Sequence, residues 1–417
     1  MRRAVVERRR SVGYTRWLWK VGVVAAAAIA VVSFAGFGGR AHAAQVFTVN
    51  VDGRNPKANE AFIAYYPSTV RVHPGDTVRF HMVGNGEPHT VTLGTLPNAA
   101  IAGFEKLTPK QLQAQQPPKW LQKLDAKVPQ LLPQGPGDAV QASANPCFIA
   151  TGQPPAKTAC AKEAQPAFDG TQSFYNSGWL ASNQKFTVHL SSSIAPGTYR
   201  FMCLLHREGM SGKIVVVPSS KAVQSPSAQY AAGQKLLASI EKKLQPTVGE
   251  LRHGQPPIPA AKVPARPFVL AGLANQAAEE ASITEFGPAK VKIPVGGSVT
   301  WYFVGAHSLT FNSNKTDDDI RAVAPDGSVH INPKAAGPAN APGEPPPSNG
   351  GNPNGPPTLK VVAHKTWNGR GFLNTGVFAN SFGPPVIEGY TITFTRAGTY
   401  RYICTVHDRM KGEIDVG

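Results

Sequence analysis

The sequence predicts an all-β fold of two tandem Greek-key β-sandwiches with loop insertions, joined by a linker that contains a helix. Short segments rich in Val, Thr, Phe and Tyr alternate with period two between Pro-Gly and Gly-Gly turns, which favours sandwiches over βαβ units. Pro and Gly number 38 and 41 of 417 residues and lack the period of collagen, so loops are extensive. The same strand pattern also occurs twice along the chain, which predicts two domains.

The repeat rests on two pairs of matching segments. Tyr66–Gly94 resembles Phe286–Asn312, because each has a strand, a Pro/Gly turn, a second strand, a Gly loop, a His and a third strand. APGTYRFMCLLHREGMSGKIVVV likewise matches RAGTYRYICTVHDRMKGEIDV further along, and FYNSG matches FLNTG more loosely. We therefore predict one domain over residues 44–218 and a second over residues 266–417.

Residues 1–43 have the three parts of a secretory signal. An Arg-rich start is followed by apolar Val21–Phe34 and by the A-x-A cleavage pattern Ala41–Ala43. The rival is an uncleaved membrane anchor, since the 19 residues Val21–Gly39 carry no charge and are just long enough to span a bilayer. Glycines near the end of this segment and the A-x-A site favour cleavage. We expect a periplasmic, extracellular or cell-surface protein, with membrane contact only if the segment stays uncleaved.

The net charge of +17 is largely a property of that signal. Without residues 1–43 the chain has 34 basic and 24 acidic residues, a net charge of +10. The remaining Lys and Arg are scattered and do not alternate with aromatic residues. A nucleic-acid footprint would be clustered on one face, so we expect no nucleic-acid partner.

Residue spacing and composition predict the structure of the linker and of the two insertions. Within linker 219–265, apolar residues at helical spacing predict a helix over Ala228–Leu244, carried by Tyr230, Leu236, Leu237, Ile240 and Leu244. The first domain has an insertion at about 95–168, with a short helix near Pro109–Gln115 capped by Thr108. The second has an insertion over 333–357, where nine Pro and five Gly predict disorder.

Two of the four cysteines, Cys147 and Cys160, lie alone in the first insertion. In an exported protein they are expected to form a disulfide that holds this loop. A metal site there is not expected, because two thiolates without further ligands complete no coordination shell.

Cys203 and Cys404 occupy equivalent places at the ends of strands in the two repeats. Each is followed by a His and a Met, and each repeat contributes another His upstream. The two sets are His89, Cys203, His206 and Met210, and His307, Cys404, His407 and Met410. Two His and one Cys in a plane with a weak axial Met is the blue-copper geometry. The sequence therefore predicts one copper site in each repeat.

Both repeats resemble the cupredoxins, the family of plastocyanin, pseudoazurin and amicyanin. The resemblance rests on PHTVT with TYRFMCLLHREGMSG and on AHSLTF with TYRYICTVHDRMKG. It implies two type 1 copper sites per chain, held by the two sets of four residues. It also implies that Thr90 and Ser308, which follow the first His of each set, hydrogen-bond across to the Cys loop. The Met ligands are the weakest members, since an axial ligand can be long or replaced.

The resemblance favours an electron carrier over an enzyme. Multicopper oxidases and nitrite reductases are built from the same domains, but they place a His beside the Cys, and this chain has no His there and no His-x-His. A copper storage or delivery protein is the other alternative, although such proteins are rich in Met. We expect one-electron Cu(II)/Cu(I) cycling, with electrons passing through the exposed edge of His206 or His407. The positive net charge favours an acidic redox partner protein.

Overall fold

The computed structural model describes residues 43–55, 57–84, 89–108, 119, 165–178, 180, 182–204, 206–253, 267–274, 281–313, 321–323, 329–336, 358–380 and 386–417. Several predictions lie wholly or almost wholly outside these residues: the signal over 1–43, the helix near Pro109–Gln115, the Cys147–Cys160 disulfide, and the disorder of the second insertion beyond residue 336. Within the described ranges no helix has the length and apolar character needed to cross a membrane.

The first half of the chain contains two sheets packed face to face, as a sandwich requires. One has the strand order β3-β1-β5-β8, with β1 at Val46–Val51, β3 at Tyr65–Tyr66, β5 at Thr77–Met82 and β8 at Lys185–His189. The other has the order β4-β10-β9-β6-β7, with β4 at Thr69–Val72, β6 at Thr92–Leu93, β7 at Tyr175–Asn176, β9 at Gly197–Cys203 and β10 at Arg207–Val216.

Alternation along the strands decides which side chains fill the core. In β5, Val78, Phe80 and Met82 are buried between the sheets, while Arg79 and His81 face the other way and are half-buried. Successive side chains of a strand point to opposite faces, so this pattern sets the register of β5 against its neighbours. Phe80 meets Phe201 of β9 edge to face across the core, with ring centroids 5.0 Å apart.

The second half repeats this arrangement. One sheet has the order β13-β24-β23-β16-β20, with β13 at Lys290–Ile293, β16 at Thr310–Phe311, β20 at Leu373–Asn374, β23 at Gly398–Ile403 and β24 at Lys411–Val416. The other has the order β19-β22-β14-β11-β12-β2, with β11 at Phe268–Ala274, β12 at Ala281–Gly287, β14 at Ser298–Phe303, β19 at Thr358–Trp367 and β22 at Val386–Phe394. Short pairs complete it, β15 (Gly305–His307) with β21 (Phe378–Asn380) and β17 (Arg321–Val323) with β18 (Val329–Ile331).

The cores of the two halves also correspond. Trp301 of β14 meets Tyr402 of β23 edge to face at 5.4 Å, in the places that Phe80 and Phe201 hold in the first half. The duplication seen in the sequence is therefore a duplication of packing.

Two short helices differ from the sequence expectation. Helix α1, Thr95–Phe104, opens the first insertion and packs its Ile101 against Phe174, Met202 and Leu204. The insertion over 333–357, expected to be disordered, begins with the helical turn α6, Pro333–Ala336. Asn332 accounts for this turn, because its side-chain oxygen accepts a hydrogen bond from the Lys334 N–H at 3.1 Å.

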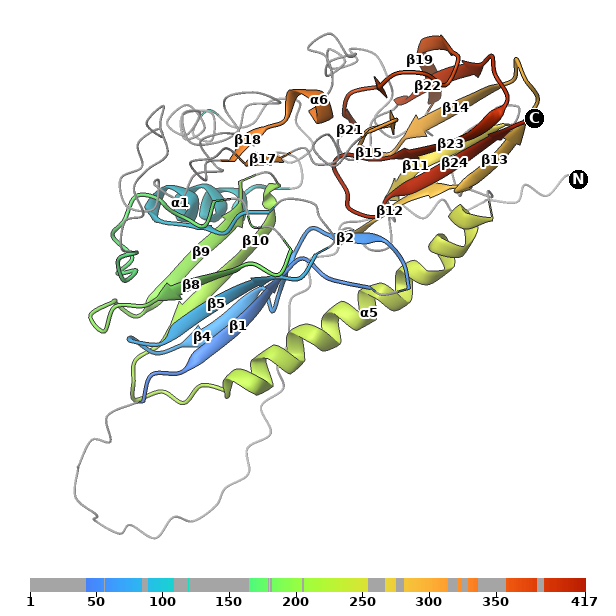
Figure 1. Cartoon of the computed structure of the whole chain (residues 1–417). Helices are drawn as coiled ribbons and strands as arrows, with labels where there is room; N and C mark the ends of the chain where they lie inside the picture. The colour runs from blue at the N-terminus through green and yellow to red at the C-terminus, as the bar shows by residue number, and fades with distance from the viewer. Residues whose placement is uncertain are drawn as a thin grey trace, which may run out of the picture.

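The long helix α5, Pro226–Arg252, runs along both halves (Figure 1). It is present where a helix was predicted over Ala228–Leu244 and extends further at both ends. Ser225 caps its start by accepting a hydrogen bond from the Ala228 N–H, and a Pro stands at its first position. Its buried residues follow one stripe: Gln229, Gly233, Leu237, Ile240, Leu244, Val248 and Leu251. Leu236 falls beside this stripe and is 47% exposed.

The two halves share a sheet. Strand β2, Glu60–Phe62, belongs to the first half by sequence but pairs antiparallel with β12, where Phe62 faces Ala281 and Glu60 faces Ile283. In Figure 1, β2 crosses from the first sandwich to the edge of the second. Phe62 is fully buried in a cluster with Leu237, Ile240 and Leu244 of α5, so apolar burial holds this crossing in place.

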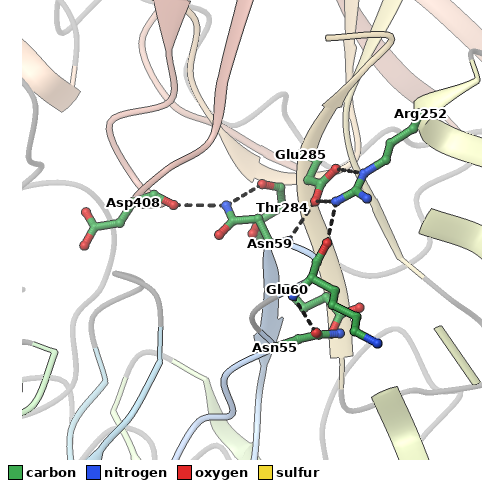
Figure 2. Close-up of polar contacts among 8 residues, drawn as sticks. Asn55, Asn59, Glu60, Arg252, Thr284, Glu285 and Asp408 are labelled. Atoms are coloured by element: carbon green, nitrogen blue, oxygen red, sulfur yellow. Dashed lines mark hydrogen bonds and ion pairs between the residues drawn. The ribbon is translucent and has the colours of Figure 1, made fainter. Parts of the chain in front are cut away.

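Polar contacts reinforce the same interface (Figure 2). The Asn59 side chain donates to the backbone oxygens of Thr284, at 2.8 Å, and Asp408, at 3.0 Å. Arg252 at the end of α5 donates to both carboxylate oxygens of Glu285, at 2.7 and 2.6 Å. The Asn59–Asp408 contact ties the segment before β2 to the loop that contains His407, and the Arg252–Glu285 contact ties α5 to β12.

Candidate metal centres

The first predicted ligand set meets at one end of the first sandwich, and we call it centre 1. Cys203 is the last residue of β9, His206 lies in the turn that follows, and His89 lies just before β6. The ligand atoms of these three residues lie within 4.8 Å of one another. His89 Nδ1 is 3.8 Å from Cys203 Sγ, and the two imidazole rings have centroids 5.0 Å apart.

The second set, centre 2, has the same construction. Cys404 follows β23, and His307 ends β15. Cys404 Sγ is 3.9 Å from His307 Nδ1 and 3.7 Å from His407 Nδ1, and the ring centroids are 4.6 Å apart. Both cysteines are free and buried. The repeated spacing in the sequence therefore corresponds to a repeated convergence of one thiol and two imidazoles.

Thr90 and Ser308 hold the two Cys loops in equivalent ways. The backbone N–H of each donates to the neighbouring Cys Sγ at 3.4 Å. The hydroxyl of Thr90 accepts from the Leu204 N–H, and that of Ser308 accepts from the Thr405 N–H, both at 2.8 Å. In each centre, one bond joins the residue after the first His to the Cys and the other joins it to the residue after the Cys. These two bonds hold the first His and the Cys at a fixed separation.

The electrostatics of both centres favour a thiolate. Burial alone would raise the pKa of Cys203, but hydrogen bonds and charge from His206 and His89 outweigh it and hold this pKa well below its usual value. The pKa of Cys404 is lowered by His307 and His407 in the same way, against the effect of burial. Burial acts to lower the pKa of His89, but Asp52 and Cys203 raise it to about 9. The deprotonated thiol is the form that ligates a metal.

The two methionines lie in the cores beside the cysteines. Met210 is buried in the cluster that contains Cys203, and Met410 in the cluster that contains Cys404. The Met410 backbone oxygen accepts a hydrogen bond from the Cys404 N–H at 2.9 Å. Their role as axial ligands stays a prediction from the sequence.

The C-terminal His residues differ in exposure. His206 is half-buried, whereas His407 is only 5% exposed. The prediction named His206 or His407, and His206 is the more exposed of the two, whereas His407 is largely covered. Part of the reason lies in its loop, because Asp408 is bonded to Asn59 and the Thr405 hydroxyl donates to the Ala335 oxygen of α6 at 2.8 Å.

Two contacts to the outer nitrogens of the first His residues were not predicted. His89 Nε2 lies 3.3 Å from the Asp52 carboxyl group, while His307 Nε2 lies 3.1 Å from the Val304 backbone oxygen. Asp52 comes before the segments whose repetition is visible in the sequence. The strand of the second half that corresponds to β1, β11, has a different sequence. The contact in centre 2 is made by the backbone oxygen of Val304, which any residue type would provide, so the sequence could not indicate it.

The donor set of each cluster matches copper chemistry. A thiolate and two imidazoles, held in a buried site, favour copper over hard cations such as Mg²⁺ or Ca²⁺, which require oxygen ligands. In the part of the chain that the structure describes, these are the two groups of three or more possible metal-ligating His, Cys, Asp or Glu residues.

Comparison with known proteins adds solved structures only. No protein-family model and no curated protein matches the sequence. Reduced auracyanin from Roseiflexus castenholzii is 18% identical, with 43% of this chain and 100% of that chain covered and a TM-score of 0.22. A pseudoazurin from Sinorhizobium meliltoi is 20% identical, with 47% and 97% covered and a TM-score of 0.17. A Cu(I) form of an amicyanin variant is 13% identical, with 41% and 82% covered and a TM-score of 0.19.

All three are cupredoxins, the family that the ligand motifs resemble. At these identities and scores the likeness carries no argument about function.

Proposed function

We propose that the protein is an exported electron carrier with one type 1 copper site in each half. The observation that carries the proposal is the repeated cluster of one free buried Cys and two His, with ligand atoms within 4.8 Å in both halves. A copper ion bound there would supply a one-electron change between Cu(II) and Cu(I). One electron would be taken from a reduced donor protein and given to an oxidised acceptor.

The surrounding chain supports this role by keeping the ligands still. Cys203 ends β9 and Cys404 directly follows β23, and each of these strands is paired with a neighbour on both sides. The loop of each Cys is also hydrogen-bonded to Thr90 or Ser308. Ligands that move little between the two oxidation states keep the reorganisation energy of electron transfer small. A delivery protein, in contrast, has to release its metal and is served by exposed ligands.

Centre 1 offers the route to partner proteins. His206 is half-buried, whereas the other imidazoles of both centres are at most 5% exposed. We infer that external donors and acceptors approach at His206, and that the net charge of +10 outside residues 1–43 favours acidic partners. Copper storage and oxidase activity remain the alternatives that the first experiment addresses.

The proposal is tested by loading the purified protein with Cu(II) and recording copper content and the visible spectrum. We expect an intense thiolate-to-copper band and two coppers per chain. Cys203→Ala and Cys404→Ala should each remove one copper and about half of the band, and the double variant should be colourless. His189→Ala is the matched control, since this exposed His of the first half contacts Thr77 and not the cluster.

A colourless loaded protein, or a band that survives both Cys substitutions, would overturn the proposal. Oxygen consumption with a phenol or diamine substrate would support the oxidase alternative. Loss of copper to a soluble chelator within minutes would support delivery over electron transfer.

A further inference from the structure

The two centres differ in what contacts the outer nitrogen of the first His. In centre 1, His89 Nε2 lies 3.3 Å from Asp52 Oδ2, and both side chains are fully buried. In centre 2, His307 Nε2 lies 3.1 Å from the backbone oxygen of Val304. The first contact is to a carboxyl group and the second to a neutral carbonyl. Otherwise the two centres have the same ligand types in the same order.

The register of the sheets shows that Asp52 occupies the place of Gly272. In the first half Val51 pairs with Met82, and in the second half Ala271 pairs with Phe303, the equivalent residue. Asp52 and Gly272 are the residues that follow. Both adopt the left-handed backbone conformation, with φ of 64° and 77°. Glycine is the residue that takes this conformation without strain, so the first half has a carboxylate where backbone preference favours Gly.

The space around each position matches its residue. A Cβ on Gly272 would lie 2.0 Å from His307 Nε2, so the second half has no room for a side chain there. In the first half the room is made by Gly84, where a Cβ would lie 1.9 Å from Asp52 Oδ2. The loop before the first His is also longer in the first half, VGNGEPH against VGAH. The carboxylate of Asp52 therefore takes the role that the Val304 oxygen has in centre 2.

Burial raises the pKa of the Asp52 carboxyl group, while hydrogen bonds from His89 and from two backbone N–H groups favour its ionised form. Oδ1 accepts from the backbone N–H groups of Gly53 and Phe62, the latter at 2.7 Å, and Oδ2 faces His89 Nε2. The two backbone partners are N–H donors. When His89 Nδ1 ligates a metal, Nε2 has the ring proton and donates it to Oδ2, so both oxygens of the carboxylate then accept hydrogen bonds. A charge in a fully buried position interacts strongly with its neighbours, because little solvent screens it.

We propose that Asp52 is a positioning residue of centre 1 and that its charge makes centre 1 the lower-potential centre of the two. The proposal rests on the copper function proposed above. By accepting from Nε2–H, Asp52 leaves His89 Nδ1 to face Cys203. Its negative charge stabilises the more positive, oxidised state of a bound copper relative to the reduced state. In centre 2 the neutral Val304 oxygen fixes the His307 ring without adding charge.

The experiment measures the reduction potential of each centre separately by spectroelectrochemistry. Cys404→Ala leaves centre 1 alone, and Cys203→Ala leaves centre 2 alone. We expect a lower potential for centre 1. In the Cys404→Ala background, Asp52→Asn and Asp52→Gly should both raise that potential towards the value of centre 2. Asp52→Gly gives centre 1 the residue that centre 2 has at this position.

Asp76→Asn is the matched control in the same background. Asp76 is a fully buried carboxylate of the first half that accepts from the backbone N–H groups of Gln45 and His73, at the opposite end of β5 from Asp52. We expect it to leave the potential unchanged. Near-UV circular dichroism and copper content show whether each variant is folded and loaded.

Two results would overturn the proposal: equal or reversed potentials of the two single-centre proteins, or a potential of centre 1 that Asp52→Asn and Asp52→Gly leave unchanged. If neither Asp52 variant binds copper, the order of the two single-centre potentials decides. Failure of the copper function is distinct, since then neither single-centre protein would show the thiolate band.

Discussion

At the residue scale, the residue that follows the first His of each centre, Thr90 or Ser308, stabilises the Cys loop through its hydroxyl group. The Thr90 hydroxyl accepts from the Leu204 N–H, and the Ser308 hydroxyl accepts from the Thr405 N–H. Both contacts are buried. A buried N–H that loses its acceptor keeps the cost of its desolvation, which is about 1–3 kcal/mol.

Thr90→Val and Ser308→Ala should therefore each lower the free energy of unfolding of the metal-free protein by about 1–3 kcal/mol. Urea denaturation followed by circular dichroism measures this. Thr300→Val is the control, because its half-buried hydroxyl pairs with the Thr391 hydroxyl on the sheet surface. A Thr90→Val protein as stable as this control would contradict the role that we give to the hydrogen bond.

Much of the candidate site could be predicted from single residues. Ligand order and spacing are local properties of the chain, so the repeated Cys-His-Met series and the upstream His were visible in the sequence. Asp52 and the burial of His407 were not, because both depend on segments far apart in sequence. The exposure of an imidazole edge is decided by what other parts of the chain lie over it.

At the scale of the element, helix α5 offers two glycines in opposite situations. Gly233 lies in the buried stripe, where a Cβ would be 2.5 Å from the backbone nitrogen of Pro67. A Cβ on Gly249 would have nothing within 4 Å. The first glycine is required for close packing of the helix, and the second only weakens the helix.

Gly249→Ala should raise the free energy of unfolding by about 1 kcal/mol, because Ala has the higher helix propensity. Gly233→Ala should lower it by about 1–3 kcal/mol, since the backbone of Pro67 cannot move aside as a side chain can. The two variants are matched controls for each other in thermal unfolding. Shifts of the same sign would show that α5 is not packed against Pro67 in this way.

The elements that the sequence predicted are those whose pattern is long and regular. The strands of the two sandwiches alternate clearly, and α5 has apolar residues at helical spacing over several turns. Helix α1 was missed because TLPNAAIAGF contains Pro and Gly and has few polar residues to define a face. Its packing against Met202 and Leu204, rather than its own pattern, stabilises it.

At the scale of the whole molecule, the interface between the halves contains a titrating carboxyl group. Glu60 of β2 is 1% exposed, and its Oε1 has no hydrogen-bond partner in the described part of the chain. Burial, with the charges of Glu241 and Glu285, raises the pKa of Glu60 from 4.5 to about 7, against opposing effects of Asn55 and Arg252. The folded protein therefore holds this proton at pH values where the unfolded chain has lost it.

Stability should consequently fall as the pH rises from about 4.5 to about 7, because in this window the folded state binds more protons than the unfolded state. Glu60→Gln should reduce this fall and should be more stable than the wild type at pH 8. Urea denaturation at pH 5 and pH 8 tests it. Glu413→Gln, which changes a half-buried carboxylate next to Arg401 and Lys290, should retain the fall. A Glu60→Gln protein with the pH profile of the wild type would exclude the assignment.

The crossing of β2 limits how the duplicated chain can be divided. Sequence composition places the division in the linker over residues 219–265, but β2 at residues 60–62 completes the sheet of the second half. A second half produced alone would present the backbone of β12 as an open edge, and open edges recruit other strands. We therefore expect that fragment to self-associate, and a peptide covering residues 55–64 to reverse the association. The cause would be the loss of three residues that lie more than two hundred positions upstream of their partners in β12.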